Sequence, residues 1–482
     1  MNGAAPADGT GAAPAATVRD AVVVGAGLSG LVCARRLAEA GLDVIVLEAR
    51  DRVGGRLLGG HVGGATVDLG GAWMSAGQAR LTALAAELGV ASVPQRRAGR
   101  PFLAEPAAGV LGEVGAALAQ WRAVRRIERR ARAVAAARGS FGRDSQSGSK
   151  SDSQSGSKSD SGNNLAALDD LSLAAWLREA IPSPLARDRI ALHAELVFAA
   201  DPAELSALYY FWILGVTGGF RPPGPELPGG GREHRFAGGA HALAARLAAR
   251  LDVRLGEPVL AIDDPGAGAP LGIRTARGAH AARRAVLAVP PVLARRIEVA
   301  LAPAADELAA ASRAGPVVKC FAAYARPFWR DAGWSGEAFR PRGTVRATVA
   351  LDPDPILLAF VVGAHAAGWA RRAPAERRAE VLATFAAQFG APAAAPIDYV
   401  EHDWAADPWA AGCVAGLPPG ILSRGAAWGA PHGRVHVAGT EAAAVWTGYM
   451  EGAIEAGERA AAEIAAEIAA EIATAPPSGP RR

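Results

Sequence analysis

The feature that most restricts the fold of this chain is a β-α-β unit close to its N-terminal end. Residues 20–25 form a β-branched run that is typical of a buried parallel strand. Residues 28–40 have the apolar spacing of a helix, which Gly41 ends as a left-handed cap. A second strand is predicted at residues 43–48. This order of elements predicts an α/β fold built on a parallel sheet.

The turn between the first strand and the helix is a G-x-G-x-x-G motif at residues 25–30. Glycine is common here, 58 of 482 residues, so the motif gains its weight from the strand before it and the helix after it. Gly25 permits the tight turn, Gly27 lets the backbone approach a pyrophosphate, and Gly30 lets the helix pack closely on the strand. Glu48 follows Gly30 by 18 residues and can accept hydrogen bonds from both ribose hydroxyls. The unit predicts a site that suits NAD or FAD equally.

The residues that follow the second strand indicate that the chain meets the dinucleotide at a second place. Two glycine pairs, at 54–55 and 70–71, come soon after the strand. Arg56 is placed to meet a phosphate or the edge of a flavin.

Length and charge set limits on the class of protein. A chain of 482 residues is expected to form two domains. Its 51 basic and 47 acidic side chains leave a net charge of +4, which gives no support to a nucleic-acid partner. Three cysteines, an odd and sparse number, favour a reducing compartment, and we expect a cytoplasmic protein. Residues 1–19 are expected to be a disordered tail, and no membrane span is expected.

Two polar stretches interrupt the predicted elements. Residues 144–164 contain the sequence DSQSGSKS twice and are expected to form a flexible insert. An arginine cluster further upstream has the spacing of the solvent-facing side of a helix, and an anion-binding patch is the alternative. Its members are Arg125, Arg126, Arg129, Arg130 and Arg132.

The use of lysine singles out one position. Arginine is the cation almost everywhere, and the only lysines are Lys150, Lys158 and Lys319. The first two fall in the insert, whereas Lys319 lies within an apolar strand predicted at residues 316–324. A lysine amine is compact, and burial lowers its pKa. Lys319 is therefore a candidate catalytic residue; the alternative is a lysine that reaches solvent from a strand.

The rest of the chain alternates helices and strands. Residues 165–214 are predicted to be mostly helical, and residues 253–289 to form short strands. A last buried strand is predicted at 434–438 and a helix at 452–473, whose glutamates are expected to face water. The apolar stripe of that helix is formed by Ile464, Ile468 and Ile472.

These motifs, in this order and spacing, resemble the flavin monoamine oxidase family. The resemblance begins at residues 22–73 and continues at 204–212, 230–239, 316–329 and 439–460. It covers nearly everything from Asp20 to about Ala473, apart from the insert. The resemblance implies an α/β fold with an α+β substrate part, in which a Rossmann-type FAD-binding domain is interleaved with a substrate-binding domain. The former would comprise residues 20–92, 237–292 and 407–473, the latter residues 93–236 and 293–406, and a tail residues 474–482.

The resemblance also implies which residues line the cofactor, FAD. The matching positions are Gly25, Gly27, Gly30, Glu48, Arg50, Arg56, Gly71, Ala72, Trp73, Val259, Glu441 and Met450. For Val259 an ordinary strand valine is the alternative. Lys319 matches the lysine that holds a water against flavin N5, and Trp404 a tryptophan that packs against the flavin. Cys413 matches the cysteine that carries the flavin covalently in some members, with a buried free thiol as the alternative.

The expected substrate end departs from the family pattern. Covalent members place one tyrosine after the cysteine and a second in the WxGYMEG stretch; Tyr449 matches the second, but Val414 stands in place of the first. Tyr209, Trp212 and Trp428 could supply another wall, or could be core residues. Arg232 stands where the family has a neutral amide, so it either attracts a substrate carboxylate or points to solvent.

The resemblance implies oxidation of a small amine by FAD, with oxygen reduced to hydrogen peroxide. No metal site is expected, because the histidines lack partners at ligand spacing. Two alternatives are a flavin desaturase that acts on carbon–carbon bonds, of the porphyrinogen or carotenoid type, and a non-catalytic flavin-binding partner protein. The oligomeric state is open, and a homodimer is one assembly to consider.

Overall fold

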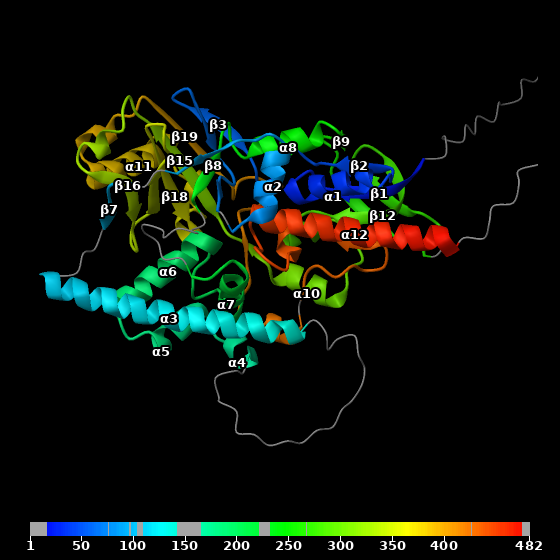
Figure 1. Ribbon diagram of the computed structural model, residues 1–482, viewed down its shortest axis with the longest axis horizontal. Helices are drawn as coiled ribbons and strands as arrows, with labels where there is room; N and C mark the ends of the chain where they lie inside the picture. The colour runs from blue at the N-terminus through cyan, green and yellow to red at the C-terminus, as the bar shows by residue number, and fades with distance from the viewer. Residues whose placement is uncertain are drawn as a thin grey trace, which may run out of the picture.

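The computed structural model describes residues 17–75, 77–95, 98–103, 109–141, 165–220, 232–266, 268–425 and 427–474. Most of the expected N-terminal tail, the insert at 144–164 and residues 475–482 lie outside these ranges, as do Gly230 and Gly231. Figure 1 shows two sheet-containing parts side by side, with a group of helices below them. No helix in the described ranges is long and apolar enough to cross a membrane.

The first sheet has eight strands in the order β13-β10-β11-β12-β1-β2-β9, with β21 paired to β12. Its strands are β1 (Val18–Val24), β2 (Val44–Leu47), β9 (Asp252–Arg254), β10 (Val259–Asp263), β11 (Leu271–Thr275), β12 (Ala279–Leu287), β13 (Glu298–Val299) and β21 (Val435–Val437). β1 lies between β2 and β12 and runs parallel to both. Since β1 begins at Val18, the tail expected at 1–19 was too long by two residues.

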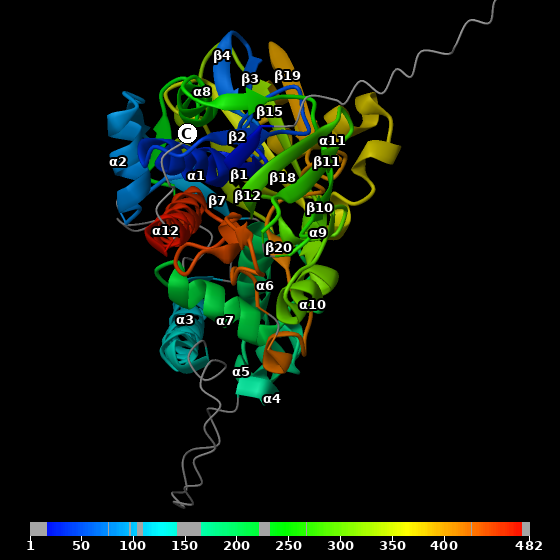
Figure 2. The ribbon, with the colours of Figure 1, turned by 90° about the vertical axis from the view of Figure 1, so that its right-hand side faces the viewer.

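Helices cover one face of this sheet, and the two that come from opposite ends of the chain lie together (Figures 1 and 2). The covering helices are α1 (Leu28–Glu39), α2 (Ala79–Glu87), α8 (His241–Ala248) and α12 (Met450–Thr474). α1 and α12 approach so closely that a Cβ at Gly457 would lie 2.5 Å from the Ser29 carbonyl oxygen. α1, the helix of the β-α-β unit, thus lies between the first sheet and the C-terminal helix α12.

The expectation for the surface of α12 was only partly right. Ile464 and Ile468 are buried, but Ile472 is 64% exposed. The glutamates do not simply face water: Glu467 accepts a hydrogen bond from Arg284 Nε at 2.7 Å, and Glu463 lies 3.1 Å from His436 Nδ1. β12 and β21 supply these partners, so tertiary contact decides the polar face of the helix.

The second sheet has six strands in the order β19-β15-β18-β17-β16-β7. Its strands are β7 (Arg100–Leu103), β15 (Val317–Ala323), β16 (Trp334–Phe339), β17 (Val345–Ala350), β18 (Ile356–Val362) and β19 (Asp398–Asp403). Every residue of β15 is buried, which includes Lys319. α11 (Pro374–Phe389) packs on one face through a core that contains Trp329, Trp369 and Phe385.

The helices below the sheets share one apolar core. They are α3 (Gly109–Phe141), α4 (Leu165–Asp169), α5 (Leu173–Ala180), α6 (Pro184–Phe198), α7 (Ala207–Val216), α9 (Pro291–Ala294) and α10 (Pro303–Ala311). Ser172, Ser183 and Ser206 cap α5, α6 and α7 by accepting backbone N–H groups, which explains why these helices start where they do.

Short strands connect the parts. β3 (Gly59–Val62) pairs with β4 (Ala65–Asp68), β5 (Trp73–Met74) and β6 (Ser92–Pro94) pair with β8 (His234–Phe236), and β14 (Arg313–Ala314) pairs with β20 (Ala415–Gly416). Val62 and Val67 pack on the second sheet, and Leu417 and Trp428 pack in the helical core. The domain boundaries remain a prediction.

Candidate active site

A cavity of about 650 Å³ runs between the first sheet, the second sheet and helices α6 and α7. Its lining includes residues of the β1–α1 turn as well as Arg232 and Phe339. Residues from all three parts of the fold therefore meet at this cavity.

The three glycines of the β1–α1 turn have three different surroundings. Gly25 has a φ of +103°, which a side chain would strain. A Cβ at Gly30 would lie 2.0 Å from the Gly25 carbonyl oxygen, so the helix can approach the strand only without one. A Cβ at Gly27 would meet no atom within 4 Å, although Gly27 lines the cavity. Gly30 is thus needed for packing, whereas the space at Gly27 stays open for a ligand.

The N-terminus of α1 is suited to an anion. Its cap, Gly27, offers no side chain to the first N–H groups, and no acidic residue lies in the first turn. Free N–H groups and the helix dipole favour a phosphate at this place. Glu48, at the end of β2, faces the same end of the cavity; its two carboxylate oxygens accept the backbone N–H groups of Ala26 and Arg50 at 2.7 and 3.0 Å.

Two arginines expected at the cofactor are held by carboxylates. Arg50 forms two hydrogen bonds with Asp407, at 2.9 and 3.0 Å. Arg56 donates to Glu441 at 2.8 Å and to the Cys413 carbonyl oxygen at 3.2 Å. Both arginines line the cavity. Glu441 does not line it, and its contact with the cavity wall is the hydrogen bond that it accepts from Arg56. These pairs fix the guanidinium groups beside the cavity.

One row of side chains crosses the second sheet and forms a wall of the cavity. Strand pairing places Lys319 on β15 opposite Phe360 on β18, Phe360 opposite Ala347 on β17, and Ala347 opposite Phe339 on β16. Residues directly opposite on paired strands project to the same face. On its other side Lys319 pairs with His402 of β19, which does not line the cavity. Lys319 therefore stands beside the apolar side chains of the row, and Arg232 lies over the ring of Phe339, 5.5 Å from its centroid.

Lys319 is buried, and its amine is held by main-chain oxygens. Nζ donates to the carbonyl oxygens of Asp68 and Gly70 at 2.8 and 2.7 Å. Burial lowers the pKa of the amine to about 8, and the carboxylate of Asp68 partly opposes that shift. The ring centroids of Trp73 and Phe360 lie 5.4 and 5.6 Å from Nζ. The site thus carries an amine that is easier to deprotonate than an exposed lysine.

The remaining catalytic and cofactor candidates also come to this cavity. Trp404 is buried, and its indole N–H donates to the Leu69 carbonyl oxygen at 2.8 Å. Tyr449 packs edge-on against Trp446, with 5.4 Å between ring centroids. The other candidates that line the cavity are Gly71, Ala72, Trp73, Val259, Cys413, Val414 and Met450.

Two expected substrate residues lie elsewhere. Tyr209 and Trp428 line a separate cavity of about 210 Å³, together with Trp212. Tyr209 packs against Phe198 and Trp212, and Trp428 belongs to a segment that enters the helical core. The structure places them apart from the large cavity, so they are not walls of it.

Sequence reasoning missed several residues that line the large cavity. They include His193, Arg296, Phe339, Ala347 and Phe360. None lies in a recognisable motif. Phe339, Ala347 and Phe360 become visible only from the strand register that aligns them with Lys319.

Comparison with known proteins identifies the family. The model of the flavin-containing amine oxidoreductases matches residues 28–465. The chain belongs to this family. It is 33% identical over 456 residues to AofH of Mycobacterium tuberculosis, whose name describes it as a flavin-containing monoamine oxidase. The aligned region covers 90% of this chain and 94% of the relative. It is 30% identical to an L-amino acid dehydrogenase of Synechocystis, with 90% and 92% covered. Cyclohexylamine oxidase from Brevibacterium oxydans has the same fold, with a TM-score of 0.80, 28% identity, and 94% and 100% covered.

Membership of the amine oxidoreductases confirms the resemblance, the α/β fold class and FAD as the cofactor. FAD-dependent amine oxidation is therefore the activity of this chain, and neither the desaturase nor the non-catalytic alternative is favoured. The cavity fits FAD on its own geometry: Gly27 leaves space beside the free N-terminus of α1, and Glu48 and Lys319 line the same cavity.

Proposed function

We propose that this flavin-dependent amine oxidoreductase converts a small primary amine to an imine, with oxygen as the electron acceptor. The α C–H bond of the amine breaks and its electron pair leaves with the hydrogen, while a nitrogen proton is lost and a C=N bond forms. When bound, FAD would supply the two-electron redox chemistry through which oxygen, with two protons, becomes hydrogen peroxide. Water then converts the released imine to an aldehyde or ketone and ammonia. The observation that carries this proposal is the buried amine of Lys319 in the wall of the FAD cavity.

The proposed roles follow from where each side chain lies. The α1 N-terminus, Gly25, Gly27 and Glu48 hold the dinucleotide, and Arg56 orients the region beside Cys413. Lys319 retains a proton or releases it near neutral pH, and the apolar row beside it excludes water. Tyr449 supplies one ring against which a neutral amine can lie, and Val414, which also lines the cavity, supplies no second ring.

An amino-acid-like substrate is the second candidate. Arg232 lines the cavity beside Phe339, and a guanidinium binds a carboxylate well. The relative named as an L-amino acid dehydrogenase gives this candidate further support. A substrate that carries both an amine and a carboxylate would place the carboxylate at Arg232.

We also propose that FAD is attached to Cys413. Cys413 is exposed and lines the cavity, whereas Cys33 and Cys320 are buried, and burial raises the pKa of both of these thiols.

Three free cysteines also support the proposal of a cytoplasmic protein. A homodimer is the proposed assembly, to be checked by analytical ultracentrifugation.

The experiment combines a visible spectrum, an amine assay and acid precipitation. The purified protein should show flavin bands that bleach when a primary amine is added without oxygen, and should release peroxide when oxygen is admitted. After acid precipitation the colour should remain with the pellet, and the Cys413→Ala variant should send it to the supernatant. Colour in the supernatant of the wild type would refute attachment but not oxidation, and absence of bleaching with every amine and amino acid would refute the oxidase.

A further inference from the structure

The positive charge of the molecule is concentrated in one surface helix. Residues 109–141, which form α3, contain seven arginines and two glutamates, a formal charge of +5. The whole chain carries +4, so the rest is close to neutral. Because α3 is 33 residues long, this charge is spread along a rod of about 50 Å.

The helix has one face in the core and the opposite face in solvent. Ala123, Ile127, Ala131 and Val134 are buried against the other helices. In Figure 2 α3 is seen nearly end-on, on the outer side of α6 and α7. Its outward face is therefore free of the other helices.

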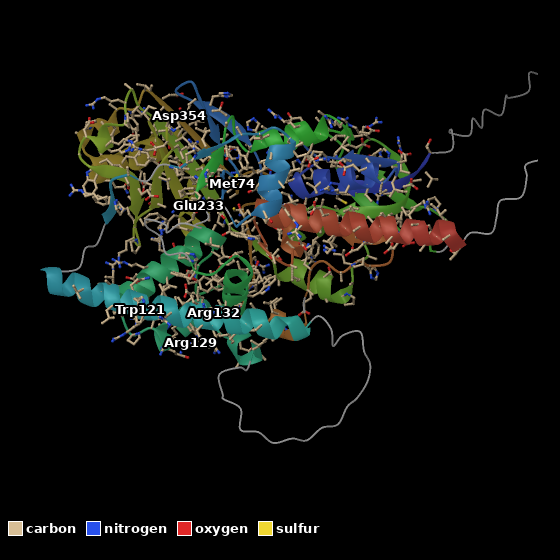
Figure 3. All side chains as sticks on the ribbon, viewed as in Figure 1. Met74, Trp121, Arg129, Arg132, Glu233 and Asp354 are labelled. Carbon is tan, nitrogen blue, oxygen red and sulfur yellow. The ribbon has the colours of Figure 1, made fainter. Side chains whose placement is uncertain are left out.

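That outward face, here called the α3 row, joins apolar and basic side chains. At 100° per residue its members project within about 80° of one another. The row consists of Val114, Leu118, Trp121, Arg125, Arg129 and Arg132. The first three are 62%, 45% and 55% exposed and make up three of the ten exposed large apolar side chains of the described residues. The three arginines are exposed too, and Figure 3 shows Trp121, Arg129 and Arg132 along α3.

The apolar and basic halves of the row are continuous. The guanidinium of Arg125 lies over the ring of Trp121, 5.1 Å from its centroid. Glu128 borders the row, is only partly exposed, and is the one acidic residue between positions 114 and 132. A partner thus meets an apolar end with a tryptophan at its border and then a series of cations.

We propose that the α3 row binds the surface of an anionic lipid bilayer. Leu118 and Trp121 would enter the boundary between headgroups and acyl chains, where tryptophan is favoured, and Arg125, Arg129 and Arg132 would contact lipid phosphates. Both halves of the row are used by this partner. A nucleic-acid duplex would use the arginines but would leave Val114 and Leu118 in water, and a second copy of the chain would oppose one positive row with another.

The test is flotation of the FAD-containing protein with lipid vesicles. The wild type should float with vesicles of equal parts phosphatidylglycerol and phosphatidylcholine, and not with pure phosphatidylcholine. Binding should weaken as salt rises, because salt screens the attraction. The triple variant Arg125→Gln/Arg129→Gln/Arg132→Gln should lose about 100-fold in partition coefficient, about fivefold per arginine.

A matched triple variant controls for net charge. Arg254, Arg274 and Arg326 are exposed, with side chains 54%, 51% and 69% accessible, and lie on β9, on β11 and after β15. Their replacement by glutamine removes the same charge and should change the partition coefficient less than twofold. An equal loss in both triple variants would overturn the α3 row as the binding surface.

A second pair of variants tests insertion of the apolar end. Leu118→Ser/Trp121→Ser should weaken flotation at least several-fold, whereas Ile397→Ser, at a residue that is 64% exposed elsewhere, should not. Brominated lipids should quench less fluorescence in Trp121→Phe than in the wild type. The proposal fails if the wild type does not float, or if these variants change self-association or duplex DNA binding in place of flotation. Amine oxidation is measured separately and is expected to be unchanged in every variant.

Discussion

Lys319 Nζ lies 2.8 Å from the carbonyl oxygen of Asp68, so the buried lysine of one sheet is fixed by the main chain that leads out of β4. The side chains of the two residues are ionisable and both buried. Burial raises the pKa of Asp68 to about 6 and lowers that of Lys319 to about 8, and each charge partly opposes the shift of the other. The pair thus places two titratable groups beside the cavity wall.

Replacement of Lys319 by methionine should keep FAD bound and slow the reaction of the reduced enzyme with oxygen. We expect a decrease of about 100-fold, the usual loss when one preorganised polar group is removed from a water-poor site. Stopped-flow mixing of anaerobically reduced protein with oxygen measures the rate. Lys150→Met, in the polar insert, is the control and should react at the wild-type rate. An unchanged rate in Lys319→Met would remove the lysine from the oxidative step.

The same substitution should change how stability depends on pH. Since the pKa of Lys319 is about 8 in the folded protein and about 10.4 when exposed, the unfolded state binds more protons between these values. The wild type should therefore gain stability relative to Lys319→Met as pH rises from 8 to 10, by about 2–3 kcal/mol. Chemical unfolding of both proteins at several pH values measures it. Parallel pH profiles would show that the amine is not buried in this way.

Substitutions at two glycines of the β1–α1 turn should have separate effects, one on packing and one on ligand binding. Gly30→Ala places a Cβ 2.0 Å from the Gly25 carbonyl oxygen and should destabilise the fold by about 3 kcal/mol or more. Gly27→Ala meets nothing within 4 Å, so the apoprotein should stay folded while FAD affinity falls at least about tenfold. Thermal unfolding of the apoprotein and FAD titration give the two readouts. Equal FAD affinity in Gly27→Ala and the wild type would place the pyrophosphate elsewhere.

Replacement of Arg232 by glutamine should distinguish the two substrate candidates. If a substrate carboxylate binds the guanidinium, kcat/KM for amines that carry a carboxylate should fall about 10- to 100-fold, as expected for a lost charged hydrogen bond. Values for neutral amines should stay the same or rise. Arg295→Gln, at an exposed arginine that does not line the cavity, serves as the control. Equal effects on both classes of amine would mean that Arg232 does not select the carboxylate.

The dinucleotide half of the site was predictable because its signals are local. The glycine spacing, the strand before it and Glu48 all fall within one β-α-β unit, and the structure has that unit as expected. Lys319 was found by its contrast with an arginine-rich composition, which needs no knowledge of the fold.

The substrate half was not predictable from local signals. Phe339, Ala347 and Phe360 join Lys319 through strand register, which is set by pairing across the sheet. Tyr209 and Trp428 were assigned by residue type, and their packing in the helical core places them at another cavity. The prediction that the α12 glutamates face water was partly wrong for the same reason, because their partners Arg284 and His436 come from strands that are distant in the sequence.

The close contact of α12 with α1 has a consequence for synthesis of the protein. Ser29 leaves the ribosome 428 residues before Gly457, which lies against it. β1 likewise cannot pair with β12 until β12 has been synthesised, and β12 cannot pair with β21 until β21 has been synthesised. During translation the nucleotide half of the molecule must therefore remain without its closing helix until α12 (Met450–Thr474) has emerged. Nascent chains that stall before residue 450 should depend on chaperones and should not retain FAD.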